Sequence, residues 1–125
     1  MMKKIYVCSP LAGDIHNNIE RAKEYARFVV KECGAIPIAP HIYFTQFLDD
    51  TVPEDRNFGT EVGLLLLSDC DELWYFGDHV SKGMIREIIA AETQSIPIRY
   101  VSDVEMENIR KENGGNQNEM EQEIY

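Results

Sequence analysis

The segment 77–87 carries the residue types best suited to chemistry in this chain. Ser81 is placed to begin a helix, and with Gly83 two positions later the backbone N–H groups of the first turn are open to an anion. Glu87 follows about one and a half turns into that helix, beside Met84 at the edge of an apolar stripe. A carboxylate in such a place can serve as a nucleophile or as a base at the floor of a pocket.

Glu87 also has a simpler interpretation, as a half-exposed carboxylate that only aids solubility. A surface glutamate commonly has an oppositely charged neighbour three or four positions away. In this chain those positions hold Gly83, Met84, Ala90 and Ala91, so a salt bridge within the helix is disfavoured. Both interpretations stay open at this stage.

The turn 9–14 joins a strand-like run to a helix and is rich in small residues. Such a turn, with Ser9, Pro10 and Gly13, can cradle a phosphate or a ribose beside the helix N-terminus. It can equally be a plain connection in which Asp14 caps the helix. It is neither a G-x-G-x-x-G motif nor a P-loop.

Aromatic residues follow the second strand-like run, in the segment 40–47. They can stack on a planar base while His41 or Gln46 hydrogen-bonds its edge. The alternative is a hydrophobic loop that packs on its own chain or on a partner subunit, and we favour it for Phe44 and Phe47. For His41, which comes directly after the strand, both interpretations are equally supported.

Two aspartates flank the third strand-like run at opposite ends. Asp71 precedes the strand, away from the predicted crevice, so we interpret it as structural. Asp78 follows the strand and is the better active-site candidate. Arg56 and Lys82 are the cations best placed to meet a phosphate, although a solvated face is the simpler role for each.

Metal and cofactor chemistry are not expected. The three histidines lack the spacing of metal ligands, and neither a serine nucleophile elbow nor the phosphate loop of flavodoxins is present. We therefore predict no metal and no cofactor.

The elements that would position these residues alternate along the chain. The apolar runs 5–8, 36–38, 73–76 and 96–101 are typical of buried strands. Between them, helical spacing of apolar residues predicts three helices, the first ended by Gly34 and the second begun by Pro53. The expected inward residues of the second and third helices are Phe58, Val62, Leu65 and Leu66, and Met84, Ile85, Ile88 and Ala91.

This alternation implies a parallel sheet with right-handed crossovers, and so an α/β fold. Proline is tolerated at sheet edges, so Pro37 and Pro97 assign the second and fourth strands to outer positions. The resulting order 2-1-3-4 predicts a flavodoxin-like, Rossmann-like three-layer sandwich. Its ligands would bind beyond the carboxyl ends of strands one and three.

Length and composition fit a single domain. The chain has 125 residues, 44% of them hydrophobic, and 12 lysines and arginines against 22 acidic residues give a net charge of −10. A field of that sign disfavours general nucleic-acid binding and membrane binding. Three scattered cysteines and the lack of a signal peptide favour the cytoplasm. We predict a domain over 1–112 and a flexible acidic tail over 113–125, with Met106 and Ile109 extending a short helix over the core.

Five short motifs occur together between residues 5 and 101. They are Ser-Pro-Leu-x-Gly-Asp at 9–14, Ala-Pro-His at 39–41, Gln-Phe-Leu-Asp-Asp at 46–50, Cys-Asp-Glu-Leu-Trp at 70–74 and Ser-x-Gly-Met-x-x-Glu-Ile at 81–88. Their combination resembles the nucleoside 2-deoxyribosyltransferase-like superfamily. That superfamily includes the 2′-deoxynucleoside 5′-phosphate N-hydrolases and a large bacterial and phage branch, which this chain matches best.

The resemblance implies roles for individual residues. Glu87, six residues after a phosphate-binding Ser81, would attack C1′ of a nucleoside or nucleotide, expel the base and form a glycosyl ester. Water or a second base would resolve the ester. Tyr6 matches a tyrosine that holds the glutamate, and His41 matches a histidine that follows the second strand.

Two positions depart from the N-hydrolase pattern. Ala12 stands where those enzymes have a phosphate-supporting arginine, and Gly63 stands where they have an aspartate, with Glu61 the nearest carboxylate. Either the substrate differs, with Arg56, Lys82 or a partner subunit compensating, or catalysis has been lost and binding retained.

The first hypothesis is therefore an enzyme that cleaves or transfers an N-glycosidic bond. Glu87, Tyr6 and Asp78 would be catalytic, with Asp78 bonding the ribose or assisting proton transfer. The substrate-binding residues would be Ser9, Pro10, Gly13, His41, Ser81, Gly83 and Met84. The alternatives are a non-catalytic nucleotide-binding protein and a structural subunit that binds no small molecule. In every case we expect a homo-oligomer, a dimer or larger, because a four-stranded sheet exposes an edge and the segment 42–47 is rich in aromatic side chains.

Overall fold

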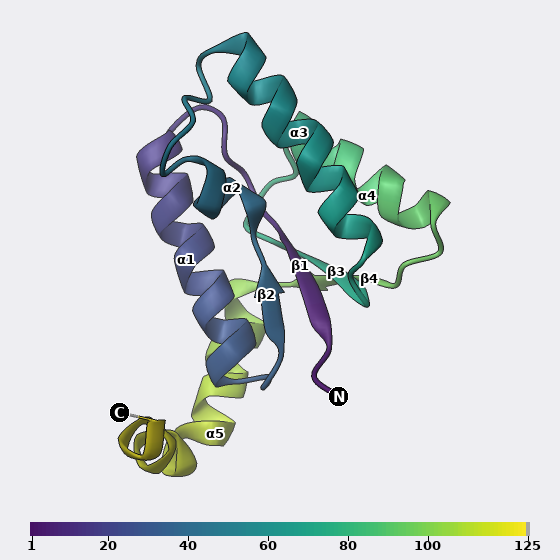
Figure 1. The fold of residues 1–125 in the computed structure, drawn as a ribbon. Coiled ribbons are helices and arrows are strands. Elements are labelled where there is room, and N and C mark those ends of the chain that lie inside the picture. The colour runs from purple at the N-terminus through teal and green to yellow at the C-terminus, as the bar shows by residue number, and fades with distance from the viewer. Residues whose placement is uncertain (125) are drawn as a thin grey trace.

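Five helices and four strands make up the part of the chain that the structure describes (Figure 1). The structure is a computed structural model; it describes residues 1–124, with side chains as far as residue 114. The elements are β1 (Lys4–Cys8), α1 (Ile15–Lys31), β2 (Ile36–Ile38), α2 (Pro40–Phe44), α3 (Pro53–Ser68), β3 (Glu72–Phe76), α4 (Lys82–Thr93), β4 (Ile98–Val101) and α5 (Asp103–Ile124).

The four strands form one parallel sheet in the order β2-β1-β3-β4, which confirms the predicted α/β fold and strand order. Tyr6 on β1 pairs with Ile38 on one side and Leu73 on the other, so β1 is a central strand. Pro37 lies in the edge strand β2, where its missing N–H breaks no ladder. Pro97 lies just before β4, and its carbonyl accepts the N–H of Leu73 at 2.9 Å.

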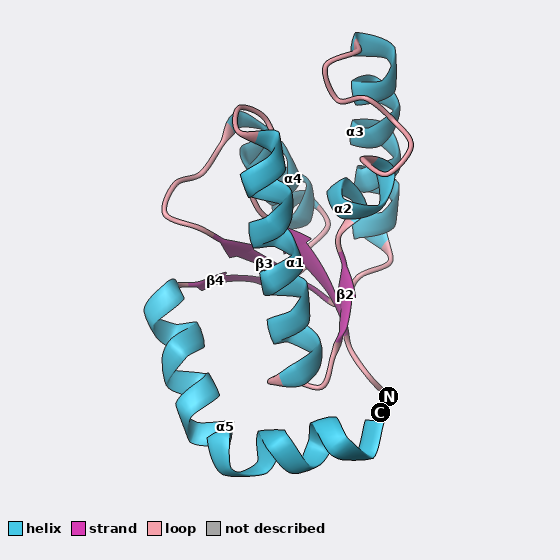
Figure 2. Cartoon of the chain, turned by 90° about the vertical axis from the view of Figure 1, so that its left-hand side faces the viewer, coloured by secondary structure: helices cyan, strands magenta, loops and turns pink. Residues whose placement is uncertain are grey.

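Each face of the sheet has its own hydrophobic core. Alternate residues of a strand point to opposite faces, so Ile5 and Val7 pack under α1 and α5, while Tyr6 and Cys8 pack under α3 and α4. Figure 1 shows the two pairs of helices on opposite sides of the strands. In Figure 2 the short helix α2 lies beside α3, above the end of β2. Met106 is buried in the first core and Ile109 packs against it, as expected.

The ends of α1 agree only in part with the prediction. Gly34, at φ +61°, follows the helix and donates its N–H to the carbonyl of Val30, as expected of a terminating glycine. Asp14 occupies the N-cap position, but its side chain makes no capping bond. It instead accepts a hydrogen bond from the side chain of Asn17, so the predicted capping role of Asp14 is wrong.

The predicted inward face of α3 is also wrong. Phe58, Leu65 and Leu66 are exposed, and Gly63 and Leu67 are buried instead. Apolar side chains cover most of the circumference of this helix, so their spacing does not single out one face. Ile85 of α4 is likewise exposed, whereas Met84 and Ala91 are buried.

The segment after the second strand is a short helix rather than the expected loop. α2 begins at Pro40, and an edge-to-face cluster of Tyr43, Phe44, Phe47 and Phe58 joins it to α3. The division into a domain over 1–112 and a flexible tail over 113–125 stays a prediction, and the side chains of 115–125 lie outside the described residues.

Two leucines of α3 test this arrangement. Leu67 is fully buried and Leu65 is 69% exposed. We expect Leu67→Ala to lower the free energy of unfolding by about 2–5 kcal/mol and Leu65→Ala to change it by less than about 0.5 kcal/mol. Urea unfolding at a protein concentration too low for association measures both, and equal losses would contradict the orientation of α3.

Candidate functional site

A cavity of about 330 Å³ lies at the carboxyl end of β1, on the face that α3 and α4 cover. Its size is within the range of small-molecule sites. Its walls come from the turn after β1, helix α2, the segment that follows α2, and the N-terminal parts of α3 and α4. The lining residues are Tyr6, Ser9, Leu11, Ala12, Pro40, His41, Phe44, Thr45, Leu48, Asp50, Asp55, Arg56, Gly59, Thr60, Gly63, Leu64, Ser81, Lys82, Gly83, Met84, Arg86 and Glu87.

Glu87 is held in this cavity by two donors from β1. The Tyr6 hydroxyl donates to Oε2 of Glu87, and the Cys8 thiol donates to Oε1 at 3.5 Å. Burial raises the pKa of Glu87 to about 7, while the two hydrogen bonds favour the ionised form and oppose that rise. Glu87 is therefore not a solvated surface carboxylate, and among the described residues its hydrogen-bond partners are a phenol and a thiol rather than a cation.

Tyr6 is fixed by the central strand and by the close approach of α3. Its hydroxyl lies next to Gly63, where a Cβ atom would come within 3.3 Å of the oxygen. Burial and the charge of Glu87 raise the pKa of Tyr6 well above its usual value, so the hydroxyl stays protonated and acts as a donor. A side chain at position 63 would crowd this hydroxyl, and this close approach explains why a glycine occupies the position.

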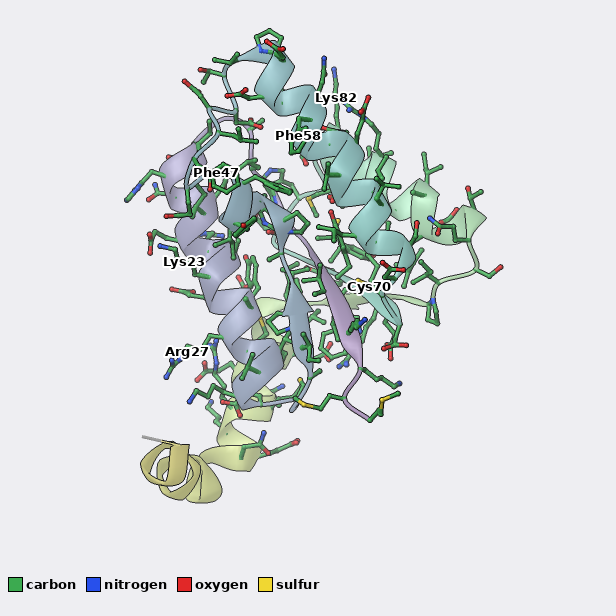
Figure 3. All side chains as sticks on the ribbon, in the orientation of Figure 1. Lys23, Arg27, Phe47, Phe58, Cys70 and Lys82 are labelled. Carbon is green, nitrogen blue, oxygen red and sulfur yellow. The ribbon has the colours of Figure 1, made fainter. Side chains whose placement is uncertain are left out.

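The start of α4 forms a second wall. Ser81 is the N-cap, and its hydroxyl accepts the N–H of Met84 at 3.3 Å, as the sequence predicted. Lys82 and Gly83 follow in the first turn, where backbone N–H groups have no partner within the helix. In Figure 3, Lys82, Phe47 and Phe58 lie at the same end of the molecule, where α3 and α4 begin.

A partly buried hydrogen bond joins the turn after β1 to α2. Oγ of Ser9 lies 2.9 Å from Nε2 of His41, and both residues line the cavity. Burial lowers the pKa of His41 to about 4, so its imidazole is neutral at physiological pH.

The cavity also contains charged residues that sequence reasoning missed. Arg86 lies one residue before Glu87. Asp50 lies in the segment before α3, and Asp55, in the first turn of α3, accepts the N–H of Asp49. The role of Cys8 was missed as well, although the alternation along β1 places it on the same face as Tyr6. Arg56 and Lys82, noted from the sequence as possible phosphate partners, both line the cavity.

Some predicted site residues lie elsewhere. Asp78 is exposed, bonds Nδ1 of His79 at 2.9 Å and lines a separate hollow with Pro10. Gly77, at φ +103°, turns the chain between β3 and Asp78. Gly13 lies in the turn before α1 at φ +98° and lines neither hollow. Asp71 accepts the backbone N–H of Lys4 at 2.7 Å, in agreement with a structural role.

No group of three or more His, Cys, Asp or Glu side chains among the described residues could hold a metal ion. The helices of the described residues are each too short or too polar to cross a bilayer.

Comparison with known proteins places this fold. A family model for a domain of unknown function (DUF7768) matches residues 3–101. No curated protein matches the chain. Among solved structures, a 2-deoxyribosyltransferase from the psychrotolerant bacterium Bacillus psychrosaccharolyticus is similar, with a TM-score of 0.63 and 19% sequence identity. The match covers 79% of this chain and 72% of that chain, and it confirms the fold that the sequence resemblance implied.

The raised pKa of Glu87 predicts a stability that depends on pH. Between about pH 4.5 and 7 the folded protein holds a proton on Glu87 that the unfolded chain has lost, so the free energy of unfolding falls as the pH rises through this range. Glu87→Gln removes the titrating group and so removes this fall in the free energy of unfolding. We expect the variant to be more stable than the wild type at pH 8, by at most about 3 kcal/mol, with the gain vanishing near pH 4.5.

Urea unfolding at pH 4.5 and pH 8 measures this difference. Glu92→Gln, at an exposed position of the same helix, is the matched control; it keeps Glu87 and should lose stability between the two pH values as the wild type does. A gain from Glu87→Gln that is the same at both pH values would contradict the raised pKa.

Proposed function

The chain belongs to the DUF7768 family, and from the site that it carries we propose that it cleaves or transfers the N-glycosidic bond of a nucleoside or nucleoside 5′-phosphate, with Glu87 as the nucleophile. The observation that carries this proposal is the Glu87 carboxylate, held on a cavity wall by Tyr6 and Cys8. The similar fold of a 2-deoxyribosyltransferase supports the same class of chemistry.

The reaction requires an ionised Glu87. One carboxylate oxygen bonds to C1′ of the sugar while the C1′–N bond breaks, and the electron pair of that bond leaves with the base, whose nitrogen takes up a proton from solvent. Water, or the nitrogen of a second base, then attacks C1′, loses a proton to solvent and releases the carboxylate. Burial leaves the carboxylate poorly solvated and raises the pKa of Glu87 to about 7. The carboxylate is therefore largely ionised slightly above neutral pH.

Tyr6 acts as a positioning residue in this scheme. Its hydroxyl remains a donor across the physiological pH range and fixes one oxygen of the nucleophile. Because Tyr6 lies on a central strand and faces Gly63, the carboxylate is oriented by a rigid part of the fold. Cys8 supports the second oxygen with a weaker donor.

The charges around the cavity indicate which part of a substrate lies where. Ser81 and Gly83 at the start of α4, with the side chains of Lys82, Arg86 and Arg56, offer donors to a phosphate or to sugar hydroxyls. These cations stand out in a chain of net charge −10. Met84, directly after this turn, contributes an apolar part of the same wall.

A non-catalytic nucleotide-binding protein is the second candidate. Ala12 and Gly63 line the cavity at positions where the N-hydrolases that this chain resembles have an arginine and an aspartate. Without these two charged groups the cavity still has room for a ligand, but it lacks charges that would assist the reaction. Turnover distinguishes the two candidates.

We further propose that the protein is a homo-oligomer in the cytoplasm. Tyr43, Phe47 and Phe58 are each more than half exposed and form one aromatic surface with Phe44. Large exposed aromatic side chains are enriched at protein interfaces, and this surface borders the cavity, because Phe44 also lines it. A second copy of the chain would cover it.

Release of free base tests the proposed reaction. A panel of nucleosides and nucleoside 5′-phosphates, with and without an acceptor base, is incubated with the protein and separated by chromatography. We expect release or exchange of base by the wild type, a loss of at least about 1,000-fold in Glu87→Gln, and a rate that rises with pH through about 7.

Glu92→Gln, exposed on the same helix, is the control and should retain full activity. No release from any member of the panel, together with thermal stabilisation by one of them, would contradict catalysis and favour the nucleotide-binding candidate.

Sedimentation analysis tests the oligomer. We expect the wild type to sediment as a dimer or a larger assembly, and Phe47→Glu to shift it towards the monomer because the added charge would be buried in the interface. Val104→Glu, at an exposed apolar position on α5, is the matched control and should leave the assembly unchanged. A monomeric wild type at high protein concentration would overturn the proposal.

A further inference from the structure

We propose that Ser9 and His41 form a neutral pair that reads the edge of the base and can present either a hydrogen-bond donor or an acceptor to it. The site would then accept bases of both kinds. This inference rests on the proposed function, because it takes the ligand to be a nucleoside or nucleotide.

The pair is held in place from both sides. Ser9 directly follows β1 and is almost fully buried, and its Oγ lies 2.9 Å from Nε2 of His41. His41 lies in the first turn of α2, and its carbonyl accepts the hydroxyl of Thr45 at 2.7 Å. The imidazole is therefore fixed through one ring nitrogen and through its backbone.

The other ring nitrogen of His41 is accessible to a ligand. Nδ1 of His41 has no hydrogen-bond partner among the described residues. At the same time, no buried side-chain nitrogen or oxygen of those residues lacks a partner. Nδ1 is thus accessible, and the space that His41 lines is the cavity that contains Glu87.

Both tautomers of His41 fit this arrangement. When the Ser9 hydroxyl donates to Nε2, the proton is on Nδ1 and the cavity meets a donor. When Nε2–H donates to Oγ of Ser9, Nδ1 is unprotonated and the cavity meets an acceptor. The pair neither gains nor loses a proton between these states, and the burial that lowers the pKa of His41 to about 4 keeps it neutral.

The surroundings of His41 favour a planar, uncharged ligand group. The residues that α2 contributes to the cavity, Pro40, His41 and Phe44, carry no charge at neutral pH. The cations Arg56, Lys82 and Arg86 come from α3 and α4 instead. An aromatic face beside a neutral hydrogen-bonding edge suits a heteroaromatic base, while the charged wall suits the phosphate or sugar.

Two substitutions of His41 separate the cavity nitrogen from the Ser9 contact. His41→Gln places an amide where Nε2 lies, so it keeps the bond to Ser9 and loses the group that faces the cavity. His41→Asn places an amide near Nδ1, so it keeps a group that can donate or accept and loses the bond to Ser9. Both are made in the Glu87→Gln background, in which the ligand is not turned over.

Calorimetric titration with adenosine and inosine, and with their 5′-monophosphates, measures the effect. The two bases carry the donor and the acceptor at the same ring edge in exchanged positions. We expect the Glu87→Gln protein to bind the two bases with affinities within about tenfold of each other. Adding His41→Gln should weaken the binding of both bases by about tenfold or more, and adding His41→Asn should weaken it by less. Ser9→Ala should weaken both, because it frees the imidazole. Thermal melting confirms that each variant is folded.

Unchanged binding in His41→Gln would overturn the inference, as would a Glu87→Gln protein that binds one base more than a hundredfold better than the other. Failure of the proposed reaction has a different signature: no base is released by the wild type, while the nucleosides still bind and the His41 variants behave as expected. If no nucleoside or nucleotide of the panel binds, both the reaction and the base-reading pair are overturned.

Discussion

The hydrogen bond from Tyr6 to Glu87 is the interaction on which the site depends. It joins the central strand β1 to helix α4 across the core and satisfies a carboxylate that has been removed from water. The bond constrains its neighbours: α3 must cover Tyr6 closely without a side chain that would displace the hydroxyl, and Gly63 meets this condition. A glycine within a helix costs about 1 kcal/mol relative to alanine. The close approach of α3 to Tyr6 therefore comes with a lower intrinsic stability of the helix.

The strand order and the position of Glu87 were predictable from the sequence for physical reasons. The two prolines disfavoured central positions for the second and fourth strands, and the uncharged residues three and four positions from Glu87 disfavoured a salt bridge within its helix. The orientation of α3 was not predictable, because its inward face is built around Gly63 and glycine contributes no hydrophobic signal. The contribution of Cys8 depends on which residue of α4 lies above β1, which the sequence pattern does not specify.

Asp78 illustrates a limit of reasoning from strand ends. It follows β3 at the edge where Ser9 follows β1, yet the left-handed Gly77 turns the chain so that Asp78 joins His79 in another hollow. Ser81, four residues after Gly77, returns the chain to the cavity. The carboxyl edge of the sheet thus borders two separate hollows. Ser9 lines the cavity that contains Glu87, whereas its neighbour Pro10 lines the other hollow with Asp78.

The partners Tyr6 and Glu87 are 81 residues apart in the chain. During synthesis β1 emerges first, but its neighbour β3 and then α4 follow only after more than half of the chain has been made. Closing so long a loop carries an entropic cost that must be met before the contacts form, so topology sets the order of events. The candidate nucleophile therefore meets its orienting hydroxyl only once nearly all of the domain has left the ribosome, and a shorter nascent chain has no assembled site.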